Sequence, residues 1–255
     1  MTRRALAGLL VFAGASAGAA DLEPRAYSNA PVGLNFLIAG YGHSQGGLST
    51  DALPIEDAQL RINTEAFAYA RTLDLGGNSG KFDVVVPFAG LSGSALIAGQ
   101  PQERNVSGLL DPRMRLSVNF YGSPALSMQD FGKYRQDLII GASVQVAAPL
   151  GQYDPSRLIN LGNHRWFIKP EIGISKAIGA LTLELSEGVT FYTTNDNYYG
   201  GKTLEQAPLS ATQVHIVYDF GHGVWGAFDQ ACCCAMSAFC SASGAWQRRQ
   251  LLESS

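Results

Sequence analysis

A set of ionisable side chains alternates with apolar neighbours along otherwise hydrophobic segments. Its members are Arg61, Glu65, Arg113, Arg115, Arg165, Lys169, Glu171, His215 and Asp219. Successive side chains of a β-strand point to opposite faces, so such residues would share a polar face with neighbours two positions away. If these polar faces point into the lumen of a narrow barrel, they could form a charged constriction that selects solutes. They could also form ion pairs that fill the interior, and we favour this role for most of the set.

Other residue types that often carry chemistry lack the partners they would need. All four cysteines lie in one short segment, at Cys232, Cys233, Cys234 and Cys240. Adjacent cysteines cannot pair with one another, and the spaced pairs of a zinc site are missing. The histidines are scattered, and no serine has the sequence context of a hydrolase nucleophile. We therefore expect no catalytic residue, no metal site and no cofactor.

The composition is poor in charge. Charged residues make up 15% of the 255 residues, and the formal net charge is -3. Soluble domains average about 25% charged residues. No run of lysine and arginine occurs, which argues against a nucleic-acid partner. The composition favours a protein with little surface in bulk water over a cytosolic enzyme.

The first residues have the pattern of a secretory signal. Arg3 and Arg4 precede an uncharged run from Ala5 to Ala20, which ends in small residues. A positive start, a short apolar run and a small-residue end are typical of a cleaved signal peptide. We expect residues 1–20 to be such a peptide. No later segment has the ~20 apolar residues of a transmembrane helix, so residence in a membrane would require strands.

Apolar and polar residues alternate through most of the remaining chain, which predicts β-strands. Residues 113–121 give the cleanest case, because every second residue from Met114 to Phe120 is apolar. The pattern predicts nine strands, over residues 32–44, 58–74, 81–92, 113–121, 137–149, 165–176, 181–193, 211–220 and 224–230. Several of these match the ~9–11 residues of a tilted membrane-crossing strand. Pro87 and Pro170 fall inside two strands, where we expect bulges or interruptions.

Two architectures fit alternating strands after a signal peptide. A soluble lipocalin-like barrel turns its apolar faces inward, whereas an outer-membrane barrel turns them toward lipid. Long connections alternate with short ones, except at residues 122–136, where we expect a small helical turn. This alternation, the low charge, the strand lengths and the aromatic residues near strand ends favour the membrane barrel.

Three long segments resemble a family of bacterial outer-membrane proteins. They are LEPRAYSNAPVGLNFLIAGYG at residues 22–42, residues 133–179, which begin KYRQDLIIGASVQVAAPLG, and residues 191–220, which begin FYTTNDNYYGG. The chain from Asp21 to Gln230 resembles the family named for a MetA pathway of phenol degradation. The resemblance implies a transporter-like β-barrel in the outer membrane. Through the family's name, it also implies a link to the breakdown of aromatic compounds.

The resemblance stops after Gln230, where alternation ends and the sequence becomes ACCCAMSAFCSASGAWQRRQLLESS. A family member would continue there through further strands. Bacterial single-chain barrels also use an even number of strands, unlike the nine predicted. We interpret residues 231–255 as an aberrant Cys-rich tail that is translated out of frame.

The sequence thus predicts a signal peptide at 1–20, a barrel domain at 21–230 and the tail at 231–255. The predicted fold class is all-β, an antiparallel up-and-down transmembrane barrel that is incomplete at its C-terminus. We expect passive, non-enzymatic passage of small, phenol-like solutes across the outer membrane. Outer-membrane lipid, the barrel-assembly machinery and the solute are the expected partners. The alternative is a soluble periplasmic lipocalin-like barrel that binds an apolar ligand.

Overall fold

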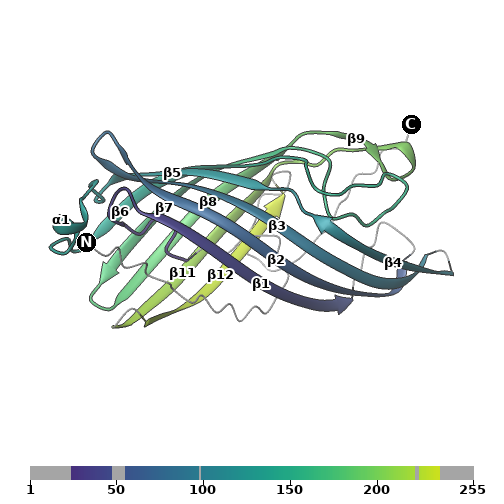
Figure 1. Ribbon diagram of the computed structural model, residues 1–255, viewed down its shortest axis with the longest axis horizontal. Coiled ribbons are helices and arrows are strands. Elements are labelled where there is room, and N and C mark those ends of the chain that lie inside the picture. The colour runs from purple at the N-terminus through teal and green to yellow at the C-terminus, as the bar shows by residue number, and fades with distance from the viewer. Residues whose placement is uncertain (1–23, 48–54, 98, 222–223, 236–255) are drawn as a thin grey trace.

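Long antiparallel strands dominate the computed structural model, which describes residues 24–47, 55–97, 99–221 and 224–235 (Figure 1). The strands are β1 (Asn35–Gly47), β2 (Ile55–Leu75), β3 (Asn78–Ile97), β4 (Gln100–Leu109), β5 (Arg113–Tyr121), β6 (Leu138–Ala147), β7 (Phe167–Ile178), β8 (Leu181–Tyr192), β9 (Asn195–Tyr198), β10 (Lys202–Leu204), β11 (Leu209–Gly221) and β12 (Val224–Ala235). The predicted signal peptide lies outside the described residues, as does the tail beyond Ala235.

The main sheet follows the order of the chain. Its strands are arranged β1-β2-β3-β5-β6-β7-β8-β11-β12, with β4 paired to the far half of β3, while β9 and β10 form a separate hairpin. The sheet curls into a half-barrel (Figure 1). Its two edges are β1 and β12, because the described residues of these strands do not pair with each other. The predicted all-β, antiparallel, up-and-down fold is confirmed.

The connections divide the half-barrel into two ends. At the turn end, short links such as residues 76–77 and 179–180 join neighbouring strands. The same end carries α1 (Met128–Phe131), the small helical turn expected within residues 122–136. At the loop end lie the long connections 148–166 and 193–208. Within the described part of the chain, no helix has the length and apolar character needed to span a membrane.

Two predicted boundaries are wrong. The predicted strands leave residues 93–112 as one long connection, but β3 continues to Ile97 and the chain turns back as β4. The polar sequence of β4 hides its strand character, because its backbone hydrogen bonds to β3 do not depend on apolar side chains. At the other end of the chain, β12 continues past Gln230 to Ala235, and Cys232 and Cys233 pair with β11.

The two prolines that fall inside predicted strands lie where the hydrogen-bond ladder is interrupted. Pro87 falls between the part of β3 that pairs with β5, which ends at Val85, and the part that pairs with β4, which begins at Phe88. Pro170 lies opposite a gap in the β7–β8 pairing, between Ile168 and Glu171. Proline has no backbone N–H to donate, so these are the positions where it costs the sheet least.

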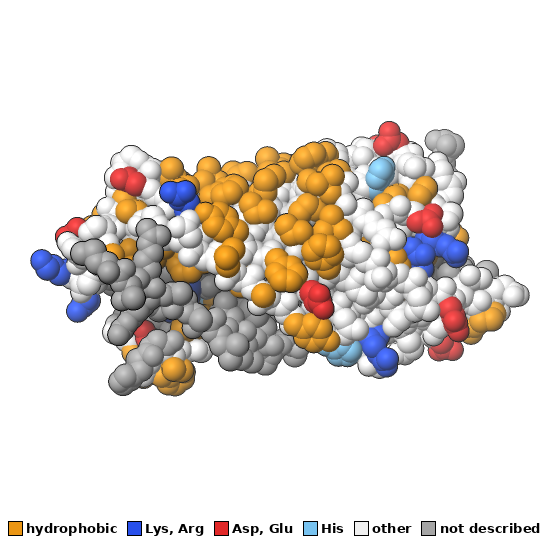
Figure 2. Space-filling model, viewed as in Figure 1, with side chains coloured by type: hydrophobic (Ala, Val, Ile, Leu, Met, Phe, Trp, Pro, Cys, Tyr) orange, Lys and Arg blue, Asp and Glu red, His pale blue; other side chains and the backbone are white. Residues whose placement is uncertain are grey.

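The two faces of the sheet differ sharply in polarity. We call the face that contacts residues 24–34 the inner face, and the opposite one the outer face. On β7, the inner-face Ser175 is 0% exposed, whereas the outer-face Ile172 is 53% exposed. Large exposed apolar side chains of the outer face include Leu116, Phe120, Ile168, Ile172, Ile174, Leu183, Leu185, Val214 and Ile216. On the face seen in Figure 2, hydrophobic side chains likewise form a band across the middle of the molecule, with charged side chains toward both ends. A soluble barrel has the reverse arrangement.

Candidate functional site

Residues 24–34 cross the inner face near the turn end before the chain enters β1. Backbone hydrogen bonds tie this N-terminal segment to its surroundings: Val32 N–H donates to Leu126 O at 2.9 Å, and Gly33 N–H donates to Thr72 O at 3.0 Å. The Thr72 hydroxyl donates to Pro31 O at 2.6 Å. The segment has no regular secondary structure, so these bonds to β2 and to the turn after β5 fix its path.

Two paired glycines make room for Tyr27, which is 3% exposed. Gly141 of β6 lies opposite Gly173 of β7. A Cβ at Gly173 would lie 2.1 Å from Tyr27 Cε2, and a Cβ at Gly141 would lie 2.5 Å from Tyr27 Cδ1. Any other residue at these positions would collide with the ring. The glycine pair is therefore a cradle for this one aromatic side chain.

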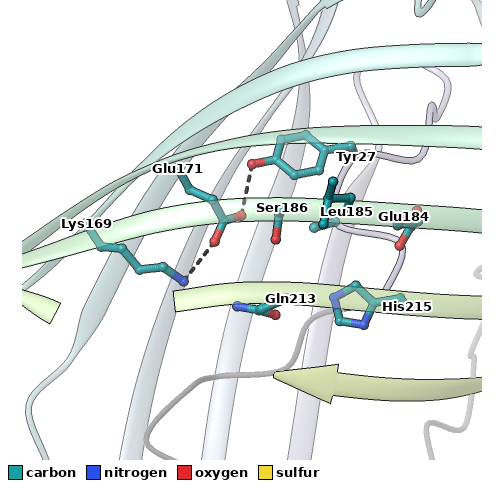
Figure 3. Close-up of a pocket in the computed structure, with 9 residues that line it drawn as sticks. Tyr27, Lys169, Glu171, Glu184, Leu185, Ser186, Gln213 and His215 are labelled. Carbon is teal, nitrogen blue, oxygen red and sulfur yellow. Dashed lines mark hydrogen bonds and ion pairs between the residues drawn. The ribbon is translucent and has the colours of Figure 1, made fainter. Parts of the chain in front are cut away.

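The Tyr27 hydroxyl joins a partly buried ion pair (Figure 3). It donates to Glu171 Oε1 at 2.9 Å, and Glu171 Oε2 lies 2.9 Å from Lys169 Nζ. Burial raises the pKa of Tyr27 most, and the negative charge of Glu171 raises it further. The phenol therefore keeps its proton at neutral pH and remains a hydrogen-bond donor to the carboxylate.

Glu184 and Trp225 hold the start of the N-terminal segment. The backbone N–H of Arg25 donates to Glu184 Oε2 at 2.6 Å, and the Ser175 hydroxyl donates to Glu184 Oε1 at 3.0 Å. The Arg25 guanidinium carbon lies 5.4 Å from the centre of the Trp225 ring on β12. The segment thus braces strands from β7 to β12. A cavity of about 10 Å³ lies between Tyr27 and strands β7, β8 and β11, which is about enough for one water molecule.

Two further contacts to aspartate side chains, one from an arginine and one from a histidine, join neighbouring strands on the inner face. Arg115 Nε of β5 lies 3.2 Å from Asp83 Oδ1 of β3. His215 Nδ1 of β11 lies 2.7 Å from Asp229 Oδ1 of β12. His215 is 3% exposed, so this contact is shielded from bulk water.

Guanidinium groups and aromatic rings stack near the loop end of the same wall. The Arg113 guanidinium carbon lies 5.9 Å from the Phe167 ring centre, and Phe167 meets Tyr192 edge to face at 6.3 Å. Arg165 lies 4.5 Å over Tyr192, and its Nη2 donates to Gln206 Oε1 at 2.5 Å. Contacts between cations and ring faces help to stabilise charges that are partly removed from water. The rim of the wall is therefore both cationic and aromatic.

The structure places the predicted site residues in four groups: on the inner face, at its rim, at the turn end and on the outer face. The inner face carries Arg113, Arg115, Lys169, Glu171 and His215, and Arg165 lies at the rim beside them. Asp219 belongs to the turn end of β11, where its Oδ1 accepts a 2.7 Å hydrogen bond from Gly221 N–H.

The prediction for Arg61 and Glu65 is wrong. Strand register pairs Ala70 with Asp83, so the even-numbered residues of β2 share the inner face with the Asp83–Arg115 pair. Arg61 and Glu65 therefore lie on the outer face. With 21 residues, β2 is about twice as long as a membrane crossing needs, so its loop-end half extends beyond the apolar band. There, an outward polar residue meets water.

Several inner-face residues were not predicted. Asp83, Glu184 and Asp229 each occupy a polar position in an alternating strand, so the pattern was a usable signal for them. Tyr27 lies in no strand, and sequence alone does not show that it packs against the glycine pair. Among the described residues, no three His, Cys, Asp or Glu side chains come together as a metal site. The arrangement offers a polar wall with paired charges.

Comparisons with known proteins agree with this architecture. Residues 42–231 match the family described as "Putative MetA-pathway of phenol degradation", so the chain belongs to that family. The structure is similar to the crystal structure of the COG4313 outer membrane channel from Pseudomonas putida F1, with a TM-score of 0.63 and 19% sequence identity. The match covers 83% of this chain and 79% of that one. Among curated proteins, none matches the sequence.

Proposed function

We propose that this member of the phenol-degradation family is a channel of the bacterial outer membrane, which passes small solutes passively along its inner face. The observation that most supports this proposal is that polar and apolar side chains are distributed in the opposite way to those of a soluble barrel. Large apolar side chains are exposed on the outer face, while Glu184, Gln213 and His215 are at most 5% exposed on the inner face. An apolar outer band with a polar interior is the arrangement of membrane barrels. The similar structure from Pseudomonas putida is that of an outer membrane channel, which supports the proposal.

Small aromatic compounds are the solutes that we propose first. The family description names phenol degradation, and the rim places aromatic rings beside two guanidinium groups. Transport of this kind needs no cofactor and no energy source. It does need a closed wall, because unpaired strand edges leave backbone groups unsatisfied in lipid. The edges of β1 and β12 must therefore pair with each other or with further strands.

Conductance in planar bilayers tests the proposal. Removing two inner-face cations with Arg113→Ala/Arg115→Ala should shift ion selectivity toward cations, because the wall becomes more negative. Arg61→Ala is the control, since it removes a positive charge from the outer face and should leave selectivity unchanged. Identical conductance and selectivity in all three proteins would contradict a channel lined by these residues.

A further inference from the structure

The loop end contains a second cavity, separate from the wall around Tyr27. Its volume is about 330 Å³, within the 300–1,000 Å³ that is usual for small-molecule sites. An apolar cavity of roughly 150 Å³ is enough to admit benzene. Strands β2, β3 and β4 form one side, and the connection between β6 and β7, together with Tyr199 from the connection after β8, forms the other. The side chains that matter for its chemistry are Leu60, Arg104, Arg157, Leu158, Ile159 and Tyr199.

Hydrogen bonds preform the wall made by residues 154–160. Asn160 Oδ1 accepts from Asp154 N–H at 2.9 Å, and Asn160 Nδ2 donates to Arg157 O at 2.9 Å. The Ser156 hydroxyl and backbone N–H donate to Asp154, which lowers the pKa of that carboxyl group and directs it into its own loop. Arg104 Nε donates to Ile159 O at 3.3 Å and so joins β4 to this loop. A ligand would meet a wall that is already folded.

The lining combines an apolar surface with an excess of positive charge. Leu60, Leu158 and Ile159 supply aliphatic surface, while Arg104 and Arg157 outnumber Glu103, the one acidic residue among those that line the cavity. The nearby Asp154 carboxylate also interacts with both arginines. A guanidinium group has five N–H donors in a planar fork that matches a carboxylate. Hydrogen bonds from arginine to a carboxylate are about twice as strong as neutral ones. This lining matches a ligand with an apolar body and one carboxylate.

We propose that this cavity captures small organic acids with an apolar body, of which benzoate is the simplest, before they enter the barrel. The inference rests on the proposed channel function and specifies a substrate class for it. The carboxylate binds between Arg104 and Arg157, and the ring lies against Leu158 and Ile159. A neutral phenol gains only the apolar contacts and therefore binds more weakly.

Equilibrium dialysis of radiolabelled benzoate tests the proposal with the full chain in micelles of dodecyl maltoside, a detergent without charge. Arg157→Gln should weaken benzoate binding about tenfold and leave phenol binding unchanged, as expected for the loss of one charged contact. Arg135→Gln is the matched control, because it removes the same charge from an exposed position near the turn end. Leu158→Asn should weaken benzoate binding several-fold without affecting acetate.

Three results would overturn the capture site. These are equal losses in Arg157→Gln and Arg135→Gln, acetate binding as tightly as benzoate, and no benzoate binding by protein that is folded in the micelles. None of these results contradicts the proposed channel function, which is tested by conductance. Conversely, benzoate binding without any conductance would support the site and contradict the channel.

Discussion

At the residue scale, the packing of Tyr27 against Gly141 and Gly173 is the most exacting contact on the inner face. Gly173→Ala would place a Cβ 2.1 Å from the ring. We expect a loss of about 1–3 kcal/mol in the free energy of unfolding, because overpacking displaces either the ring or the backbone. Urea unfolding in micelles measures this.

Two further variants separate the collision from a general cost of adding a methyl group to a strand. Gly90→Ala on β3 should change stability little, because a Cβ there would meet nothing within 4 Å. Gly173→Ala should also lose most of its effect when Tyr27 is replaced by alanine. An equal loss with and without the Tyr27 ring would refute the cradle.

Glu187 is an ionisable residue on the outer face, beside the apolar Leu185 and Ile172. The Ser210 hydroxyl donates to its Oε1 at 2.5 Å, and the Thr212 hydroxyl donates to its other oxygen. Glu187→Ala should cost about 1–3 kcal/mol of unfolding free energy, since two hydroxyl groups lose their acceptor on an apolar surface. Glu187→Gln keeps an acceptor oxygen and should recover much of the loss. To rank the variants, samples are heated to increasing temperatures before electrophoresis, and the temperature at which the band of folded protein disappears is compared. Equal stability of all three would contradict this account.

At the element scale, the N-terminal segment narrows the inner space at the turn end. Tyr27→Ala should increase single-channel conductance, because it removes a buried aromatic ring from the inner face beside Glu171. Tyr69→Ala is the matched control on the outer face, and it should leave conductance unchanged. The segment would have no role in limiting passage if both variants conducted like the unmodified chain.

The elements also show where alternation is a reliable guide. Strands β5 to β8 and β11 agree closely with the predicted ranges, because each lies in the apolar band, where two environments enforce alternation. Strand β4 and the loop-end half of β2 lie beyond that band. There, both faces meet water or loop residues, so polarity no longer tells inside from outside. This is why Arg61 and Glu65 were assigned to the wrong face.

At the scale of the whole molecule, the outer face needs an apolar environment. Cells that express residues 1–255 should carry the protein in the outer membrane, and it should migrate differently on gels before and after boiling. The physical reason is that a closed hydrogen-bonded sheet in lipid resists detergent until it is heated. A soluble periplasmic protein without such a shift would favour the lipocalin-like alternative. Aggregated or degraded protein would indicate that the edges of β1 and β12 remain open.

The sequence by itself determined the all-β class, most of the strands and the family, because these depend on local alternation and on long stretches of matching residues. It also marked the polar positions of Arg115, Lys169 and Glu171. Only the tertiary structure decided which face is inner and which charges pair. It also decided that Tyr27 occupies the glycine cradle. Those features depend on strand register and on contacts such as that between Tyr27 and Glu171, 144 residues apart, which no local pattern encodes.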